Sequence, residues 1–107
     1  MHRTDRNECC RVSWLQGDHG AMTETFRIGI LPELEQTAGF CSASLMVDRS
    51  AGLGSATTAW ETRAAMEASR SAADDMRSRA ASDAGGPIVD VHEFDLAYAH
   101  LHVPEMA

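Results

Sequence analysis

The 107-residue sequence predicts a single α+β domain with the element order β-α-β-β-α-β and an antiparallel sheet. Two segments carry this prediction. Residues 31–40 combine a helix end, a glycine stop at Gly39 and the start of a strand. Residues 57–62 form a strand that ends in Trp60 and runs into a helix capped by Thr62. Their order and spacing define a scaffold better than they define a reaction.

The first third of the chain shows the two periodicities that separate strands from helices. Residues 10–15 alternate apolar and polar side chains, which predicts a short strand with one apolar face. From residue 20 to residue 37, apolar side chains recur every four positions, as at Met22 and Phe26, and predict an amphipathic helix. Pro32 lies within this helix and removes one backbone hydrogen bond, so we expect a kink there.

The rest of the chain predicts a hairpin, a second helix and a last strand. Strands over 40–47 and 53–60 flank a segment of turn-forming residues. The second helix begins after Thr62 and ends at the Gly-Gly-Pro segment 85–87. A long strand is expected from Ile88 to about Leu101.

Composition excludes several classes of function. The formal net charge is −7, and all nine basic residues are Arg. This acidic balance argues against binding to the phosphates of a nucleic acid. No apolar stretch approaches the ~20 residues of a membrane-spanning helix. Residues 1–8 lack the apolar region of a secretory signal, so we expect a cytoplasmic protein that binds neither nucleic acid nor membrane.

The domain is expected to span residues 9–101, between a disordered tail at 1–8 and a C-terminal tail at 102–107. A chain this short buries only part of its surface, and pairing two sheets in a homodimer would compensate. The three cysteines form neither a disulfide framework nor a metal-binding motif, and we interpret them as tolerated thiols: Cys9, Cys10 and Cys41.

The chain resembles a known group, the antibiotic biosynthesis monooxygenase-like domains of the dimeric α+β barrel superfamily. The resemblance covers about residues 9–101, nearly the whole chain. Its residues are the helix end at Pro32 to Leu34, the Ala38-Gly39-Phe40 step, the turn from Val47-Asp48-Arg49 to Gly52, and Ala59-Trp60-Glu61-Thr62 before a helix carrying Ala65 and Met66.

The resemblance implies a ferredoxin-like monomer, two of which close a barrel, with a pocket between the helices and the sheet of each subunit. Members of the group include cofactor-independent oxygenases of phenols and anthrones, haem-degrading enzymes, and proteins without known activity. Two interpretations therefore stay open. One is the cofactor-independent oxidation of a small electron-rich aromatic, and the other is a non-catalytic dimeric module that binds a small molecule or acts as a scaffold.

By position, Trp60 matches the tryptophan that lines the pocket in the oxygenase and haem-degrading branches. Trp14, Phe26 and Met66 would complete the apolar side of a binding site. The alternative is that these large side chains form the core, with Trp60 as an anchor between strand and helix. The position at which the oxygenase-like pattern has an Asn is Ala56 here, which counts against the enzyme interpretation.

His92 is the candidate catalytic acid–base, since an ordinary histidine pKa of about 6.5 suits proton abstraction. The alternative is a surface or dimer-edge histidine. Glu93 and Asp95 lie on the opposite parity of the strand, so we expect them to meet Arg side chains rather than His92. The second helix, residues 62–84, contains no histidine that could hold a haem iron. His100 and His102 have a chelating spacing without a third ligand, so neither a cofactor nor a metal is predicted.

Overall fold

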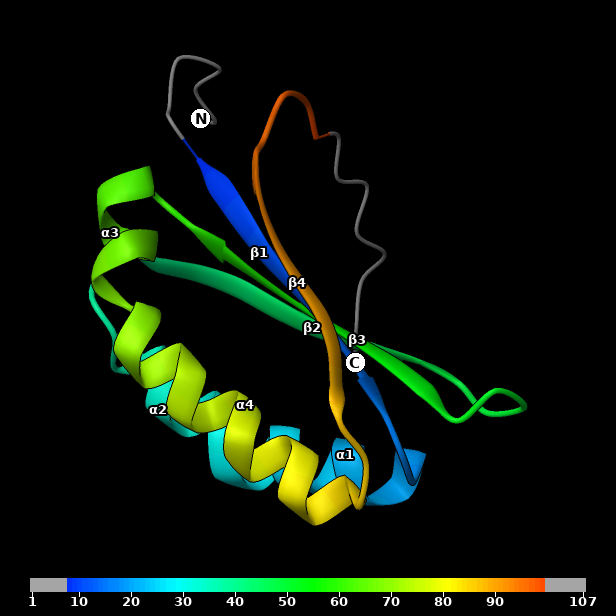
Figure 1. Cartoon of the computed structure of the whole chain (residues 1–107). Helices are drawn as coiled ribbons and strands as arrows, with labels where there is room; N and C mark the ends of the chain where they lie inside the picture. The colour runs from blue at the N-terminus through cyan, green and yellow to red at the C-terminus, as the bar shows by residue number, and fades with distance from the viewer. Residues whose placement is uncertain (1–7, 100–107) are drawn as a thin grey trace, which may run out of the picture.

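The computed structural model describes residues 8–99, which form a four-stranded antiparallel sheet with the helices packed on one side (Figure 1). The strand order β2-β3-β1-β4 with antiparallel pairing confirms the predicted ferredoxin-like α+β fold. In chain order the elements are β1 (Cys9–Gln16), α1 (His19–Glu24), the π-helix η1 (Thr25–Ile30), α2 (Leu31–Glu35), β2 (Phe40–Asp48), β3 (Leu53–Trp60), α3 (Arg63–Ala68), α4 (Arg70–Ala84) and β4 (Ile88–Asp95).

The first helical segment is continuous from His19 to Glu35, as predicted, but its middle is wound as a π-helix. Asp18 caps its start, because its carboxylate accepts a hydrogen bond of 2.8 Å from the Ala21 N–H. The Leu31 N–H donates to the carbonyl of Phe26, five residues back. Pro32 follows directly and has no N–H to continue an α-helical pattern. The expected distortion at the proline therefore takes the form of a wider turn before it.

The second helical segment, expected as one helix, is interrupted at Ser69, which separates α3 from α4. The Thr62 hydroxyl caps α3 by accepting from the Ala65 N–H at 3.0 Å, as predicted. The Ser69 hydroxyl donates to the Met66 carbonyl at 2.6 Å, which satisfies a carbonyl at the end of α3. Gly85 ends α4 in the left-handed conformation, with φ 77°.

Two glycines allow close approaches that hold the layers together. Gly39 has φ 81°, and a Cβ added there would lie 2.5 Å from the Cβ of Ala65 in α3. A Cβ on Gly86 would lie 1.9 Å from the carbonyl oxygen of Gln16 at the end of β1. Side chains at these positions would push α3 and the start of β4 away from their neighbours.

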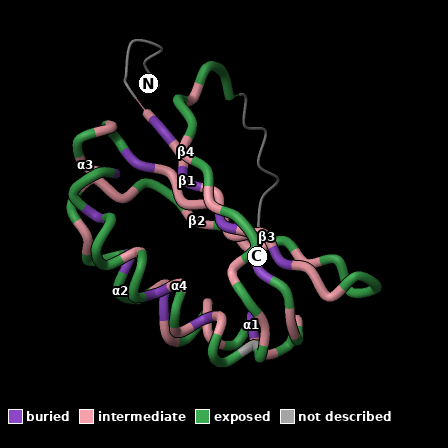
Figure 2. Tube along the Cα trace, viewed as in Figure 1, coloured by how far each residue is buried: buried purple, intermediate pink, exposed green. Residues whose placement is uncertain are grey.

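The two faces of β1 are arranged opposite to what its sequence pattern suggests. Cys9, Arg11, Ser13 and Leu15 are buried and alternate with half-buried neighbours (Figure 2). Arg11 and Ser13 thus face the helices, whereas the apolar side chains of the even-numbered residues lie on the outer face of the sheet. The strand does have one apolar face, and that face points away from the core.

The last strand ends earlier than the sequence predicts. β4 stops at Asp95, and the Leu96 N–H makes one further bond of 2.8 Å to the carbonyl of Glu8. The partner strand β1 begins at Cys9, so the backbone beyond Leu96 has no β1 residues left to pair with. The expected end near Leu101 lies outside the described residues.

The hydrophobic core lies between the helices and the inner face of the sheet. Its buried members are Cys9, Leu15, Met22, Ile30, Leu34, Trp60, Met66, Met76 and Ala80. A bulge between Trp14 and Leu15 brings Ile88 to the helix side, where it packs against this core. Within residues 8–99, none of the helices has the length and apolar character needed to cross a membrane.

Candidate functional site

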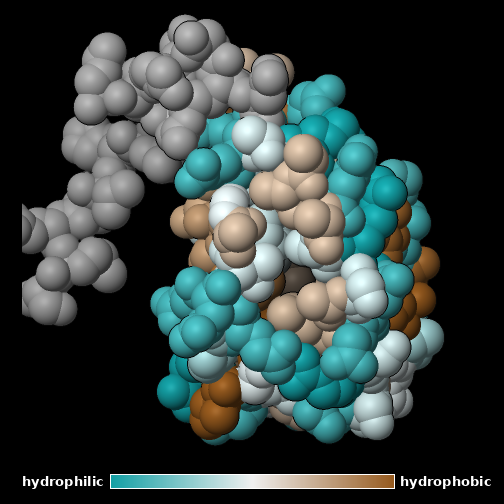
Figure 3. Space-filling model, turned by 90° about the vertical axis from the view of Figure 1, so that its left-hand side faces the viewer, coloured by the Kyte–Doolittle hydropathy of each residue, from teal (hydrophilic) through white to brown (hydrophobic). Residues whose placement is uncertain are grey.

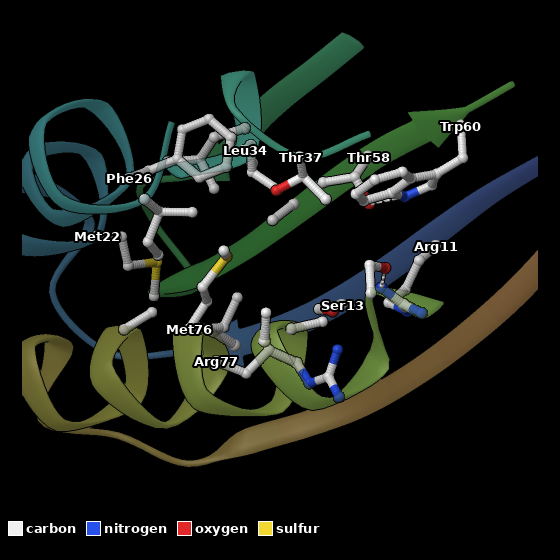
Figure 4. A pocket seen from close by; sticks show the side chains of 18 residues that line it. Arg11, Ser13, Met22, Phe26, Leu34, Thr37, Thr58, Trp60, Met76 and Arg77 are labelled. Carbon is white, nitrogen blue, oxygen red and sulfur yellow. Dashed lines mark hydrogen bonds between the residues drawn. The ribbon is translucent and has the colours of Figure 1, made fainter. Parts of the chain in front are cut away.

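A cavity of about 70 Å³ lies between the helices and the sheet (Figure 4). Its apolar wall is formed by Leu15, Met22, Phe26, Ile30, Leu34, Leu45, Ala56, Trp60, Ala72, Ala73, Met76 and Ala80. The surface on one side of the molecule is hollowed, and residues of neutral to apolar hydropathy form the rim (Figure 3). The shape and lining are those of a site for a small apolar or aromatic molecule.

Trp60 is held rigidly at the end of β3. It is 1% exposed, and its indole Nε1–H donates to the Thr58 hydroxyl at 3.0 Å. The ring meets Phe40 edge-on, with the ring centroids 5.7 Å apart. One wall of the cavity is therefore a fixed aromatic surface (Figure 4).

The end of the cavity beside Trp60 is polar, and its centre is the buried guanidinium of Arg11, a residue that is 3% exposed (Figure 4). Arg11 donates from Nε to Glu93 at 3.1 Å, from Nη1 to the Ser69 hydroxyl at 3.1 Å and from Nη2 to the Met66 carbonyl at 2.8 Å. The break between α3 and α4 supplies two of these three acceptors. The interruption of the helix is thus what holds the Arg11 side chain in place.

Glu93 compensates the buried charge of Arg11 and is shared with a second arginine. Arg70 donates to Glu93 at 2.7 Å from the surface side of α4. The hydrogen bonds from Arg70 and then from Arg11 lower the pKa of Glu93 to about 2, against an opposing effect of burial. Glu93 is therefore ionised at neutral pH. The expectation that Glu93 and Asp95 meet arginines is confirmed, since Arg63 pairs with Asp95 at 2.5 Å.

Besides Arg11, the cavity wall contains five polar side chains: Ser13, Thr37, Thr58, Ser69 and Arg77. Ser13 is 6% exposed, and its hydroxyl has no hydrogen-bond partner among residues 8–99. The Thr58 hydroxyl accepts a hydrogen bond from Trp60, and its own O–H can still donate one. Arg77 enters from α4 and pairs with Asp74, while burial and then the nearby Arg11 charge lower its pKa. Within the described residues the cavity wall contains two arginines and no carboxylate.

The structure separates the predicted site residues into two groups. Trp60 and Phe26 both line the cavity, at opposite ends of it (Figure 4). Met66 is fully buried beside them but contributes its carbonyl to Arg11 rather than its side chain to the wall. Trp14 and His92 lie together on the outer face of the sheet, with ring centroids 5.8 Å apart, and do not reach the cavity.

His92 is part of a small surface cluster. Its Nε2 lies 2.9 Å from a carboxylate oxygen of Asp90, and its ring stacks on Phe94 at a centroid distance of 6.1 Å. All of these side chains project from the sheet on the side away from the helices. This geometry gives His92 no access to a ligand in the cavity of its own chain.

Sequence reasoning missed Arg11, Ser13 and Arg77 as lining residues. The alternation in β1 contained the signal, but an arginine on the polar face of a half-apolar strand is ordinarily assigned to solvent. Arg77 belongs to a mixed-charge run that predicts a solvated helix face, and it turns toward the cavity instead. No group of three or more candidate metal-binding side chains occurs within residues 8–99.

Comparisons with known proteins support the fold and leave the activity open. No model of a known protein family matches the chain. The sequence is 40% identical over 109 residues to the uncharacterised protein Rv2558 of Mycobacterium tuberculosis, and 37% identical over 110 residues to Rv2557 of the same organism. These matches cover 98% of this chain and 46% and 48% of the relatives. The chain thus spans about half the length of the curated relatives that it matches.

Solved structures with the same arrangement include two oxygenases of Streptomyces. The monooxygenase ActVA-Orf6 of Streptomyces coelicolor, solved with nanaomycin D, aligns with a TM-score of 0.68 over 92% of this chain and 94% of that one, at 16% identity. SnoaB, a cofactor-independent oxygenase from Streptomyces nogalater, aligns with a TM-score of 0.62 over 92% and 99%, at 16% identity. The chain therefore has the fold of the antibiotic biosynthesis monooxygenase-type domains, as the resemblance in its sequence implied.

Proposed function

We propose that this protein binds a small electron-rich aromatic molecule in the cavity and oxidises it with molecular oxygen, without a cofactor. The observation that carries this proposal is the cavity itself. A rigid Trp60 wall lies beside the positive charge of Arg11, and Arg77 lines the same cavity. The oxygenases that share the fold add support, since one of them is described as cofactor-independent.

The lining residues suit a reaction in which the substrate supplies the electrons. A phenol or anthrone loses a proton from an activated position, and a guanidinium beside its oxygen stabilises the anion that forms. The carbanion adds to O₂ with proton uptake and gives a hydroperoxide. Loss of water from the CH–OOH group leaves a carbonyl, so that one CH₂ and one O₂ become one C=O and one H₂O.

No histidine, carboxylate, cysteine, lysine or tyrosine side chain lines the cavity within residues 8–99. In this proposal the protein therefore lowers the pKa of the substrate by stabilising its anion, and does not use a side chain as a base. His92 has no part in the chemistry, because it lies on the other side of the sheet.

The second candidate function is a non-catalytic module that binds a small molecule. The same lack of a base in the wall favours it, together with Ala56, which lines the cavity at the position where the oxygenase-like pattern has an amide side chain. Both candidates use the same cavity and differ only in whether the bound molecule is consumed.

Oxygen uptake separates the two candidates. With no cofactor added, we expect uptake above the buffer rate on at least one member of a panel of hydroxynaphthoquinols, anthrones and catechols, of which the single-ring catechols best fit a cavity of about 70 Å³. Trp60→Phe should reduce this rate at least severalfold, because it removes part of the cavity wall and its hydrogen bond to Thr58. Trp14→Phe is the matched control, since Trp14 lies on the outer face, and it should leave the rate unchanged. Uptake on no member of the panel would favour the binding module.

We also propose that the outer face of the sheet joins two copies of the chain. Two large apolar side chains on this face are exposed, Met46 by 65% and Phe94 by 48%, and Trp14 lies between the strands that carry them. Exposed apolar side chains gathered on one face are typical of an interaction surface.

Light scattering coupled to size-exclusion chromatography tests this assembly. The unmodified chain should elute as a dimer, and Phe94→Glu should shift it to the monomer mass because two charges would be buried in the symmetric contact. Ile28→Glu is the control, since Ile28 is 57% exposed on the helical side and its change should leave the dimer intact. A monomeric unmodified chain would refute the proposed contact.

A further inference from the structure

We propose that the polar end of the cavity is an anion subsite, formed by Ser13, Arg11 and Arg77, and that the ligand carries a negatively charged oxygen on a single aromatic ring. The inference rests on the proposed function only in assuming that the cavity takes an aromatic molecule. It adds the charge of that molecule, its size and the side chains that recognise it.

The charges around this end are not balanced within the described residues. The ion pairs connect Arg11 and Arg70 to Glu93, and Arg77 to Asp74. In these ion pairs three guanidinium groups share two carboxylates, and Glu67 also lies near Arg70. None of these carboxylates lines the cavity, so the excess positive charge is that of the cavity wall. A buried site with excess positive charge favours an anion, because bringing one in removes the repulsion between the two arginines that line it.

The hydrogen-bond donors at this end are incompletely used. Arg11 has five N–H groups; three donate hydrogen bonds, one from each nitrogen, and Nη2 also lies 3.1 Å from Glu93. Ser13 lies two residues further along the same face of β1, and its hydroxyl makes no hydrogen bond among residues 8–99. Because Ser13 lines the cavity, its hydroxyl can donate to the oxygen of a bound ligand.

The two layers of the protein contribute opposite sides of the subsite. Ser13 and Arg11 come from the sheet and Arg77 from α4 (Figure 4). An oxygen between them would receive hydrogen bonds from both sides. The apolar body of the ligand would then lie against Trp60 and extend toward Phe26 at the far end of the same cavity (Figure 4).

The size of the cavity restricts the rest of the ligand. Its volume is about 70 Å³, whereas an engineered protein cavity that binds benzene measures about 150 Å³. A fused polycyclic molecule would need a large rearrangement of the core. A single ring bearing a carboxylate or a phenolate needs the least adjustment, since the side chains of Met22 and Met76 in the wall can change rotamer.

Calorimetric titration with benzoate and with benzamide tests the subsite, since the two probes share a shape and differ in charge. We expect benzoate to bind about tenfold more tightly, the difference typical of a charge-assisted hydrogen bond. Arg77→Gln should abolish the preference and Ser13→Ala should reduce it severalfold. Arg79→Gln is the matched control, because it removes the same charge from α4 outside the cavity, and it should retain the preference.

Equal binding of the two probes, or a preference that survives Arg77→Gln, would overturn the anion subsite. Binding of neither probe would also overturn it. None of these results decides the proposed oxidation, because oxygen uptake on neutral phenols is measured separately. Conversely, a clear benzoate preference without any oxygen uptake would leave the subsite standing in a protein that binds its ligand without consuming it.

Discussion

Replacing Glu93 with Gln is expected to lower the free energy of unfolding by about 3 kcal/mol, the cost typical of leaving one member of a buried ion pair uncompensated. The Arg11 side chain is 4% exposed, and among residues 8–99 its charge has no other carboxylate partner within hydrogen-bond distance. The amide of the variant still accepts a hydrogen bond, so the loss of unfolding free energy reflects the missing negative charge. Urea denaturation followed by circular dichroism would measure it.

The stabilising contribution of the Glu93 carboxylate depends on pH. The pKa of Glu93 is lowered from 4.5 to about 2 in the folded protein, so its carboxylate stabilises the fold at pH values above 4.5. That contribution is lost as the pH falls from 4.5 through about 2. The difference in unfolding free energy between the parent and Glu93→Gln should therefore be constant near neutrality and shrink over this acidic range.

Glu61→Gln provides the control, since Glu61 is exposed and lies just before α3. It should change the unfolding free energy by less than about 0.5 kcal/mol. A Glu93→Gln variant as stable as this control at pH 7 would show that Arg11 does not depend on its carboxylate partner.

Trp60→Ala is expected to cost about 4 kcal/mol of unfolding free energy, as is typical when a large buried aromatic is truncated. The indole is almost fully buried, packs edge-on against Phe40 and is bonded to Thr58. Its removal would enlarge the existing cavity, and free indole should then fill the space. We expect added indole to raise the melting temperature of the variant by several degrees.

Trp14→Ala distinguishes this rescue from non-specific binding. Trp14 lies on the outer face of the sheet and does not line this cavity, so its truncation should cost less and indole should not restore stability. If indole stabilised both variants equally, the enlarged cavity would not be its binding site.

The parts of the fold that the sequence predicted are those fixed by local chemistry. The helix caps at Thr62 and the stop at Gly85 depend on neighbouring backbone groups, and both are present as expected. The strand limits of β3 follow from its own composition, and they match the prediction. The break at Ser69 could not be predicted in this way, because the Ser69 hydroxyl is bonded to Arg11, 58 residues away in the sequence.

The candidate site was only partly predictable for the same reason. Trp60 and Phe26 could be placed by family position and helical period, and the structure brings them to one cavity. The direction of β1 could not be derived, since alternation shows two faces without showing which one the helices cover. Trp14 was therefore assigned to the pocket while Ser13 and Arg11 were not.

The alternation along β1 has an evolutionary consequence. Because neighbouring residues face opposite sides of a single layer, a substitution at Arg11 or Ser13 changes the cavity, and one at Val12 or Trp14 changes the exposed face. One short stretch of gene thus encodes two surfaces in interleaved codons. Descendants of this chain can alter what they hold inside and what they present outside by separate single-residue steps, without insertions and without a new scaffold.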